Sequence, residues 1–158
     1  AAARPDAMKP FRFKLKTVLE VRVNEEAQAG ELYSQAQVLL EEALSFQRAV
    51  EEAIEGNLTA CQQAFDGQAA TGTLAHLQTA LRELRGQLSQ LEPVVAERQT
   101  ETDAKWQELL TARCRREALE KMRDQQQAAH DRELARTEQQ AIDEMVLLRE
   151  AGGFARKW

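Results

Sequence analysis

The chain has 158 residues, of which 30% are charged, 5% are aromatic and only three are proline. This composition, combined with an apolar pattern typical of helices, favours long helices over a compact domain with a large core. The net charge of −5 is too small to indicate a nucleic-acid or membrane partner by itself. No apolar run reaches the length that spans a membrane. The two cysteines share no motif spacing, which indicates free thiols as in a cytosolic protein.

The first expected helix covers residues 11–66, after Pro10, which limits extension toward the N-terminus. We interpret residues 1–10 as a disordered tail or as residues added for expression, with Met8 as the natural start. Apolar residues within the helix recur with alternating steps of three and four, a spacing typical of coiled coils. They are Leu15, Val18, Ala29, Leu32, Ala36, Leu39, Ala43, Phe46, Val50 and Ala53, with Arg22 and Glu25 in the two remaining slots.

A turn is expected over residues 67–73, where two glycines and two threonines lie close together without a periodic apolar residue. Gly67 suits the left-handed position at the end of the first helix. The second expected helix covers about residues 74–150. Gly152-Gly153 ends it, and residues 152–158 form a flexible C-terminus.

The second helix has its own seam, formed by Leu74, Leu77, Leu81, Leu84, Leu88, Leu91 and Val95. Pro93 lies within this run and predicts a kink or a local break, because it removes a backbone donor. Polar residues Arg98, Thr102 and Lys105 then occupy the seam positions. An apolar stripe from Trp106 to Met122 therefore predicts a shift of the seam onto another face.

When the chain folds back at the turn, a residue of the first helix faces a residue of the second, and the two residue numbers add up to about 140. This places Trp106 near Tyr33 and Leu91 near Val50. Large side chains then face small ones. The predicted fold is all-α: a single antiparallel two-helix coiled-coil hairpin over residues 11–151, monomeric and kinked near Pro93. A parallel dimer is the alternative.

The same pairing leaves residues beyond about 130 without a partner from the first helix. The apolar side chains Ile142, Met145, Val146 and Leu148 lie there and predict a binding face. The alternatives are that Phe11 and Phe13 fold back onto them or that the helix end frays. Six Lys/Arg against two acids make residues 1–22 basic, whereas six acids against one Arg make residues 41–66 acidic. Such clusters can also be ordinary solvated helix faces.

The sequence contains no recognisable catalytic or metal-binding pattern. His76 and His130 stand alone, and no glycine-rich phosphate loop is present. Residues 111–123 contain five Lys/Arg, but they lack interleaved aromatics and include Glu117 and Glu120, which argues against a nucleic-acid site. We therefore expect no enzyme activity, no cofactor and no bound metal.

The segment from Met8 to Arg22 resembles the start of the flagellar export protein FliJ family. Residues 25–29 extend the resemblance, and residues 115–119 and 138–144 are similar to the C-terminal region of that family. The residues that carry the initial match are Phe11, Phe13, Leu15, Val18, Leu19 and Arg22. Related stalk proteins of injectisomes, of the YscO type, share this layout and remain an alternative, as does a passive coiled-coil scaffold.

The resemblance implies a non-catalytic stalk, similar to the coiled-coil part of the γ subunit of rotary ATPases. It implies binding to a hexameric export ATPase, to the export gate protein FlhA and to export chaperones. It also implies a cytoplasmic location near the flagellar base, with membrane association through partners only. By analogy the ATPase surface comprises Phe11, Phe13, Leu15, Arg22, Ile142, Met145, Val146 and Arg149. The gate surface comprises Phe65, Leu74 and Leu77.

Overall fold

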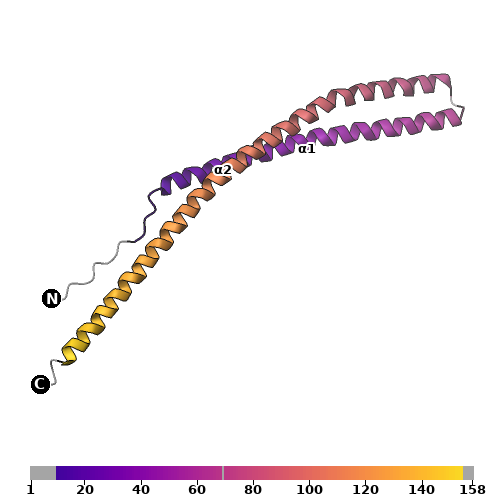
Figure 1. Ribbon diagram of the computed structural model, residues 1–158. Helices are drawn as coiled ribbons and strands as arrows, with labels where there is room; N and C mark the ends of the chain where they lie inside the picture. The colour runs from indigo at the N-terminus through magenta and orange to yellow at the C-terminus, as the bar shows by residue number, and fades with distance from the viewer. Residues whose placement is uncertain (1–9, 69, 155–158) are drawn as a thin grey trace. The chain divides into compact units, whose positions relative to one another are not determined.

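The computed structural model describes residues 10–68 and 70–154, which form two long α-helices without a strand between or beside them. Helix α1 (Lys16–Asp66) has 51 residues, and helix α2 (Thr71–Phe154) has 84 (Figure 1). The all-α prediction is confirmed. The predictions made for residues 1–9 and 155–158 lie outside the described residues.

The helix ends differ from the predicted ones by a few residues. α1 begins at Lys16, not at Phe11, and the amide of Lys16 donates to the carbonyl of Phe13 at 3.3 Å. Before the helix, half-buried Phe11 and Phe13 alternate with exposed charged residues. This period of two is typical of an extended segment that covers an apolar surface with one side. α2 starts at Thr71 and continues through Gly152 to Phe154, so the predicted stop at the glycine pair is wrong.

The residues group into two units. Unit 1 comprises Ala1–Asn24 and Arg113–Trp158, and unit 2 comprises Glu25–Ala112. In unit 2 the magenta part of α1 and the rose part of α2 lie side by side and run in opposite directions (Figure 1). This arrangement confirms the predicted antiparallel helical hairpin.

The turn of the hairpin uses a left-handed residue at a different position from the predicted one. The amide of Gly67 donates to the carbonyl of Gln63 at 2.9 Å and ends α1. Gln68, not Gly67, has a positive φ of 54°. A Cβ atom at residue 67 would lie 3.0 Å from the Gln63 carbonyl oxygen, so close approach to the backbone explains the glycine.

The seam of unit 2 shares only some of its α1 positions with the prediction. Ala36 and Val50 are buried as expected, but Leu32, Leu39 and Phe46 are 40–58% exposed. The half-buried positions between them are Tyr33, Leu40, Gln47 and Ile54, one residue further along the chain. Leu32, Leu39 and Phe46 therefore lie beside the seam rather than within it, and their predicted place in the seam is wrong.

The seam of α2 does not shift after Val95, contrary to the prediction. Its half-buried or buried positions continue through Arg98, Thr102 and Lys105 in unbroken register, whereas Trp106 is 39% exposed. The long stems of Arg98 and Lys105 lie along the seam, and their charged ends pair at the surface with Glu101 and Glu108, at 2.9 and 3.0 Å.

Thr102 joins the two helices of unit 2 across a narrow part of the seam. It is only 6% exposed, and its hydroxyl lies 2.8 Å from the carbonyl oxygen of Arg98 and 3.2 Å from that of Ala36. The second contact sets the register, because a heptad slip would remove it. The pairing of Ala36 with Thr102 places Leu88, rather than the predicted Leu91, opposite Val50.

Replacing Thr102 with valine keeps the shape of the side chain and removes the contact between the helices. We expect the free energy of unfolding to fall by about 1 kcal/mol, the typical net contribution of one hydrogen bond. Urea denaturation followed by circular dichroism measures this loss. Thr100→Val is the matched control, because Thr100 is exposed and its hydroxyl bonds only within α2, at 2.9 Å from the carbonyl of Ala96.

Pro93 lies inside α2, and the helix continues through it. The predicted local break is therefore absent. Figure 1 shows α2 changing direction in its rose-coloured part, within unit 2. A bend without a break is the ordinary response of a helix to an internal proline, which removes one hydrogen bond and crowds the preceding turn.

Candidate protein-binding surfaces

A groove in unit 1 contains the two N-terminal phenylalanines of the predicted ATPase surface. Its volume is about 690 Å³, and its apolar lining consists of Phe11, Phe13, Leu19 and Val23. The ring of Phe11 lies 5.7 Å from the ring of His130, centroid to centroid, close to the partner predicted for it by the hairpin. Polar groups line the rest of the groove: the charged Lys16, Glu20, Glu120 and Arg123, and the amides Asn24 and Gln127.

The other two N-terminal residues of that set lie in different surroundings. Leu15 is 36% exposed and does not line the groove, although its carbonyl accepts the amide of Leu19 at 2.9 Å as α1 begins. Arg22 is half-buried on α1. The prediction therefore grouped residues that share a segment but not a single pocket.

The C-terminal part of the predicted ATPase surface lies in a stretch of α2 that is rich in exposed apolar side chains. We define the C-terminal patch as Ile142, Met145, Val146, Leu147 and Leu148. Each of these side chains is about half exposed or more, up to 72%. Four of them, with Arg149, line a groove of about 510 Å³. The helix is intact here, so fraying does not explain the exposure.

Phe11 and Phe13 do not cover the C-terminal patch. They line a separate groove with Gln127 and Glu120, and the two grooves of unit 1 share no residue. A helix that exposes so many large apolar side chains in sequence is unusual in a protein that acts alone. The patch is the strongest candidate for a partner-binding surface among the described residues of unit 1.

The predicted gate surface is split by its exposure. Phe65 is 75% exposed near the end of α1. Leu74 and Leu77 are half-buried seam residues at the start of α2. Only Phe65 offers a large accessible ring, so a partner that docks at the turn would make its main apolar contact there.

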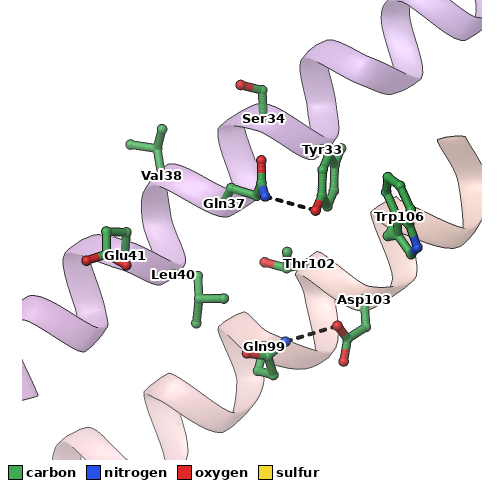
Figure 2. A pocket seen from close by; sticks show the side chains of 10 residues that line it. All are labelled: Tyr33, Ser34, Gln37, Val38, Leu40, Glu41, Gln99, Thr102, Asp103 and Trp106. Carbon is green, nitrogen blue, oxygen red and sulfur yellow. Dashed lines mark hydrogen bonds between the residues drawn. The ribbon is translucent and has the colours of Figure 1, made fainter.

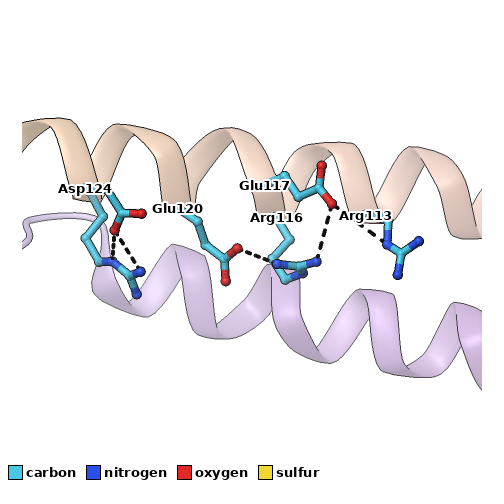
Figure 3. A network of polar contacts seen from close by, with 6 residues as sticks. Arg113, Arg116, Glu117, Glu120 and Asp124 are labelled. Atoms are coloured by element: carbon cyan, nitrogen blue, oxygen red, sulfur yellow. Dashed lines mark hydrogen bonds and ion pairs between the residues drawn. The ribbon is translucent and has the colours of Figure 1, made fainter.

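Three of the five cations in the basic cluster at residues 111–123 pair with neighbouring carboxylates (Figure 3). Arg113 and Arg116 both approach Glu117, at 3.9 and 3.7 Å, and Arg116 also pairs with Glu120. Arg123 donates to Asp124 at 2.9 and 3.0 Å. These local pairs support the helix and lower the net positive charge that a phosphate ligand would meet.

A groove that the sequence analysis did not identify lies across α1 and α2 in unit 2 (Figure 2). Its volume is about 590 Å³, and its floor includes Thr102. Tyr33 and Trp106, both in its lining, are in contact, with ring centroids 5.1 Å apart and planes tilted by 44°. The hairpin pairing predicted this aromatic contact. The sequence did not indicate that polar seam residues beside it would line a groove.

Within residues 10–68 and 70–154, no helix is long and apolar enough to cross a membrane. Over the same ranges, no three histidine, cysteine or carboxylate side chains are grouped to hold a metal ion.

The model of the family described as "Flagellar FliJ protein" matches residues 11–152, nearly the whole chain. The chain belongs to the FliJ family. This family consists of non-enzymatic components of flagellar and type III export, and the two long helices fit such a member.

A solved structure from Chlamydia trachomatis, described as a YscO homolog, CT670, shares the fold of this FliJ family member. The TM-score is 0.50 and the sequence identity is 18%, over 94% of this chain and 100% of the other. At this identity the similarity concerns the fold alone. Comparison with curated proteins finds no significant match.

Proposed function

We propose that this FliJ family member is a stalk-like coiled coil of the flagellar export apparatus that binds the hexameric export ATPase and couples it to the export gate. The family match over residues 11–152 and the antiparallel hairpin of unit 2 support this role. The observation that carries the proposal furthest is the C-terminal patch, because a long helix with exposed apolar side chains needs a partner to cover them.

The proposed ATPase surface has two parts, both in unit 1. The C-terminal patch supplies apolar area, with Arg149 at its edge. Phe11 and Phe13 supply two aromatic side chains in a groove with mixed charges. Leu15, just before α1, and Arg22, on α1, complete the proposed set. Apolar anchors surrounded by charged groups are typical of protein interfaces.

The proposed gate surface lies at the turn of unit 2 and would contact FlhA. Phe65 is its accessible anchor, and Leu74 and Leu77 support it from the seam. In this role the protein itself catalyses nothing and acts as a monomer that escorts export chaperones. Its proposed location is the cytoplasmic face of the inner membrane at the flagellar base, held there through its partners.

Two alternatives keep the same fold. A stalk of an injectisome would use equivalent surfaces, and the fold similarity to the YscO homolog agrees with it. A passive scaffold would use none of them. Genetic complementation distinguishes the flagellar role from the injectisome role. Restored motility in a strain that lacks the chain supports the flagellar role, whereas restored effector secretion alone supports the injectisome.

The proposal is tested by adding the purified chain to the cognate export ATPase. We expect a higher turnover rate and a larger hexamer fraction, because a central coiled coil that contacts several subunits stabilises the ring. Turnover is measured by phosphate release and hexamer content by sedimentation. An unchanged rate together with an unchanged hexamer fraction, at concentrations where the chain is folded, would contradict the proposal and favour the scaffold.

A further inference from the structure

The groove at Tyr33 and Trp106 differs chemically from the surfaces assigned above. One aromatic ring comes from each helix of unit 2, and Trp106 remains 39% exposed despite its contact with Tyr33. The hydroxyl of Tyr33 accepts a hydrogen bond from the Gln37 side chain at 2.8 Å, which holds the tyrosine ring in place. The partly exposed indole of Trp106 therefore packs against a tyrosine ring that is held in position (Figure 2).

The groove is negatively charged. Its lining contains the carboxylates of Glu41 and Asp103 and no cationic side chain. On α2, Arg98 and Lys105 adjoin lining residues in the sequence, and they pair with Glu101 and Glu108. Asp103 accepts a hydrogen bond from the uncharged side-chain amide of Gln99 at 3.0 Å and has no cationic partner among the described contacts.

The surrounding part of α1 has the same sign. Between Arg22 and Arg48 the chain contains five glutamates and neither lysine nor arginine. Arg48 reaches back to Glu41 at the edge of the groove, and both side chains are more than half exposed. Such an exposed pair is easily exchanged for a competing cation, since surface ion pairs contribute little free energy.

We infer that this groove binds a cationic segment of a partner protein, with an arginine or lysine stacked on Trp106 and paired with Asp103. Tryptophan is the best aromatic partner for a cation, and a carboxylate three residues earlier on the same helix face supplies the countercharge. Val38 and Leu40 line the same groove and provide apolar contact for the stem of the bound side chain. This inference does not depend on the proposed ATPase or gate contacts.

The test uses the full chain and a fluorescein-labelled, alanine-based helical peptide that carries arginine and leucine on one face. Fluorescence anisotropy measures its dissociation constant. We expect saturable binding that weakens with salt, and about a tenfold loss in Asp103→Asn and in Trp106→Leu, comparable with one cation–π contact and one partly desolvated ion pair. Thermal melts verify that each variant remains folded.

Two matched controls make the result specific. Glu97→Gln removes the same charge from α2 at an exposed position outside the groove, and it should leave binding unchanged. A peptide with citrulline in place of arginine keeps the shape and lacks the charge, and it should bind about tenfold more weakly. Equal binding of the citrulline peptide, no saturable binding, or an equal loss in Glu97→Gln and Asp103→Asn would overturn the inference.

Discussion

Replacing Met145 with aspartate is expected to weaken binding to the export ATPase by at least about tenfold. Met145 is 64% exposed and lies in the middle of the C-terminal patch. An interface that covers it gains about 1.5–3 kcal/mol from burying such a side chain, and a buried unpaired carboxylate adds a penalty of its own. Ile142→Asp, one turn earlier, is expected to behave in the same way. Surface plasmon resonance with immobilised ATPase measures the dissociation constants.

The control for this prediction is Phe65→Asp at the turn. Phe65 is also large, apolar and exposed, so the substitution makes the same chemical change on the surface assigned to the gate. Circular dichroism should show unchanged helicity in all three variants, because none of the side chains is buried. If Phe65→Asp weakened ATPase binding more than Met145→Asp, the assignment of the two surfaces would be reversed.

A second large effect is expected for Val50→Asp, which should lower the free energy of unfolding by about 3 kcal/mol or more. Val50 is 6% exposed in the seam of unit 2, where the register places Leu88 opposite. A charge introduced there loses its hydration within an apolar seam. Urea denaturation followed by circular dichroism measures the loss.

Phe46→Asp is the informative comparison, because the sequence pattern places both residues inside. Phe46 is 58% exposed in the structure, so its replacement should cost less than about 1 kcal/mol. Similar losses in the two variants would contradict the observed seam and restore the one predicted from the sequence.

The helices and the antiparallel pairing were predictable because apolar residues recur at helical spacing on both sides of one glycine-rich turn. The faces were less predictable. On α1, apolar residues occur both in the seam and beside it: Ala36 fits either pattern, while Leu39 and Leu40 compete for the next position. Only the partner helix decides between them, and Thr102 does so by bonding to the carbonyl of Ala36.

The apparent shift of the α2 seam has a similar explanation. A seam assigned from hydrophobicity alone includes Trp106 and leaves out Arg98 and Lys105. The structure keeps the polar residues because their aliphatic stems pack while their charges reach surface glutamates. Trp106 then lies beside the seam, partly exposed, where it lines the groove that the sequence did not predict.

Among the candidate surfaces, the C-terminal patch was predictable from chain length and spacing, since it lies beyond the reach of a shorter first helix. The gate set was less predictable. Leu74 and Leu77 follow the seam pattern, and the structure places them there half-buried. An apolar residue off the seam, such as Phe65, is a better sequence signal for a docking surface than one within it.

The pairing of two helices from one chain is the central claim, because the position of every surface depends on it. It is tested most directly by electron paramagnetic resonance on a Cys61→Ser, Cys114→Ser chain with spin labels at Ser34 and Asp103, which line the same groove. Packed helices predict a separation of about 25 Å or less, label linkers included, that survives dilution with unlabelled protein. A separation of about 100 Å, as in one continuous helical path, or a short distance lost on dilution would contradict the account.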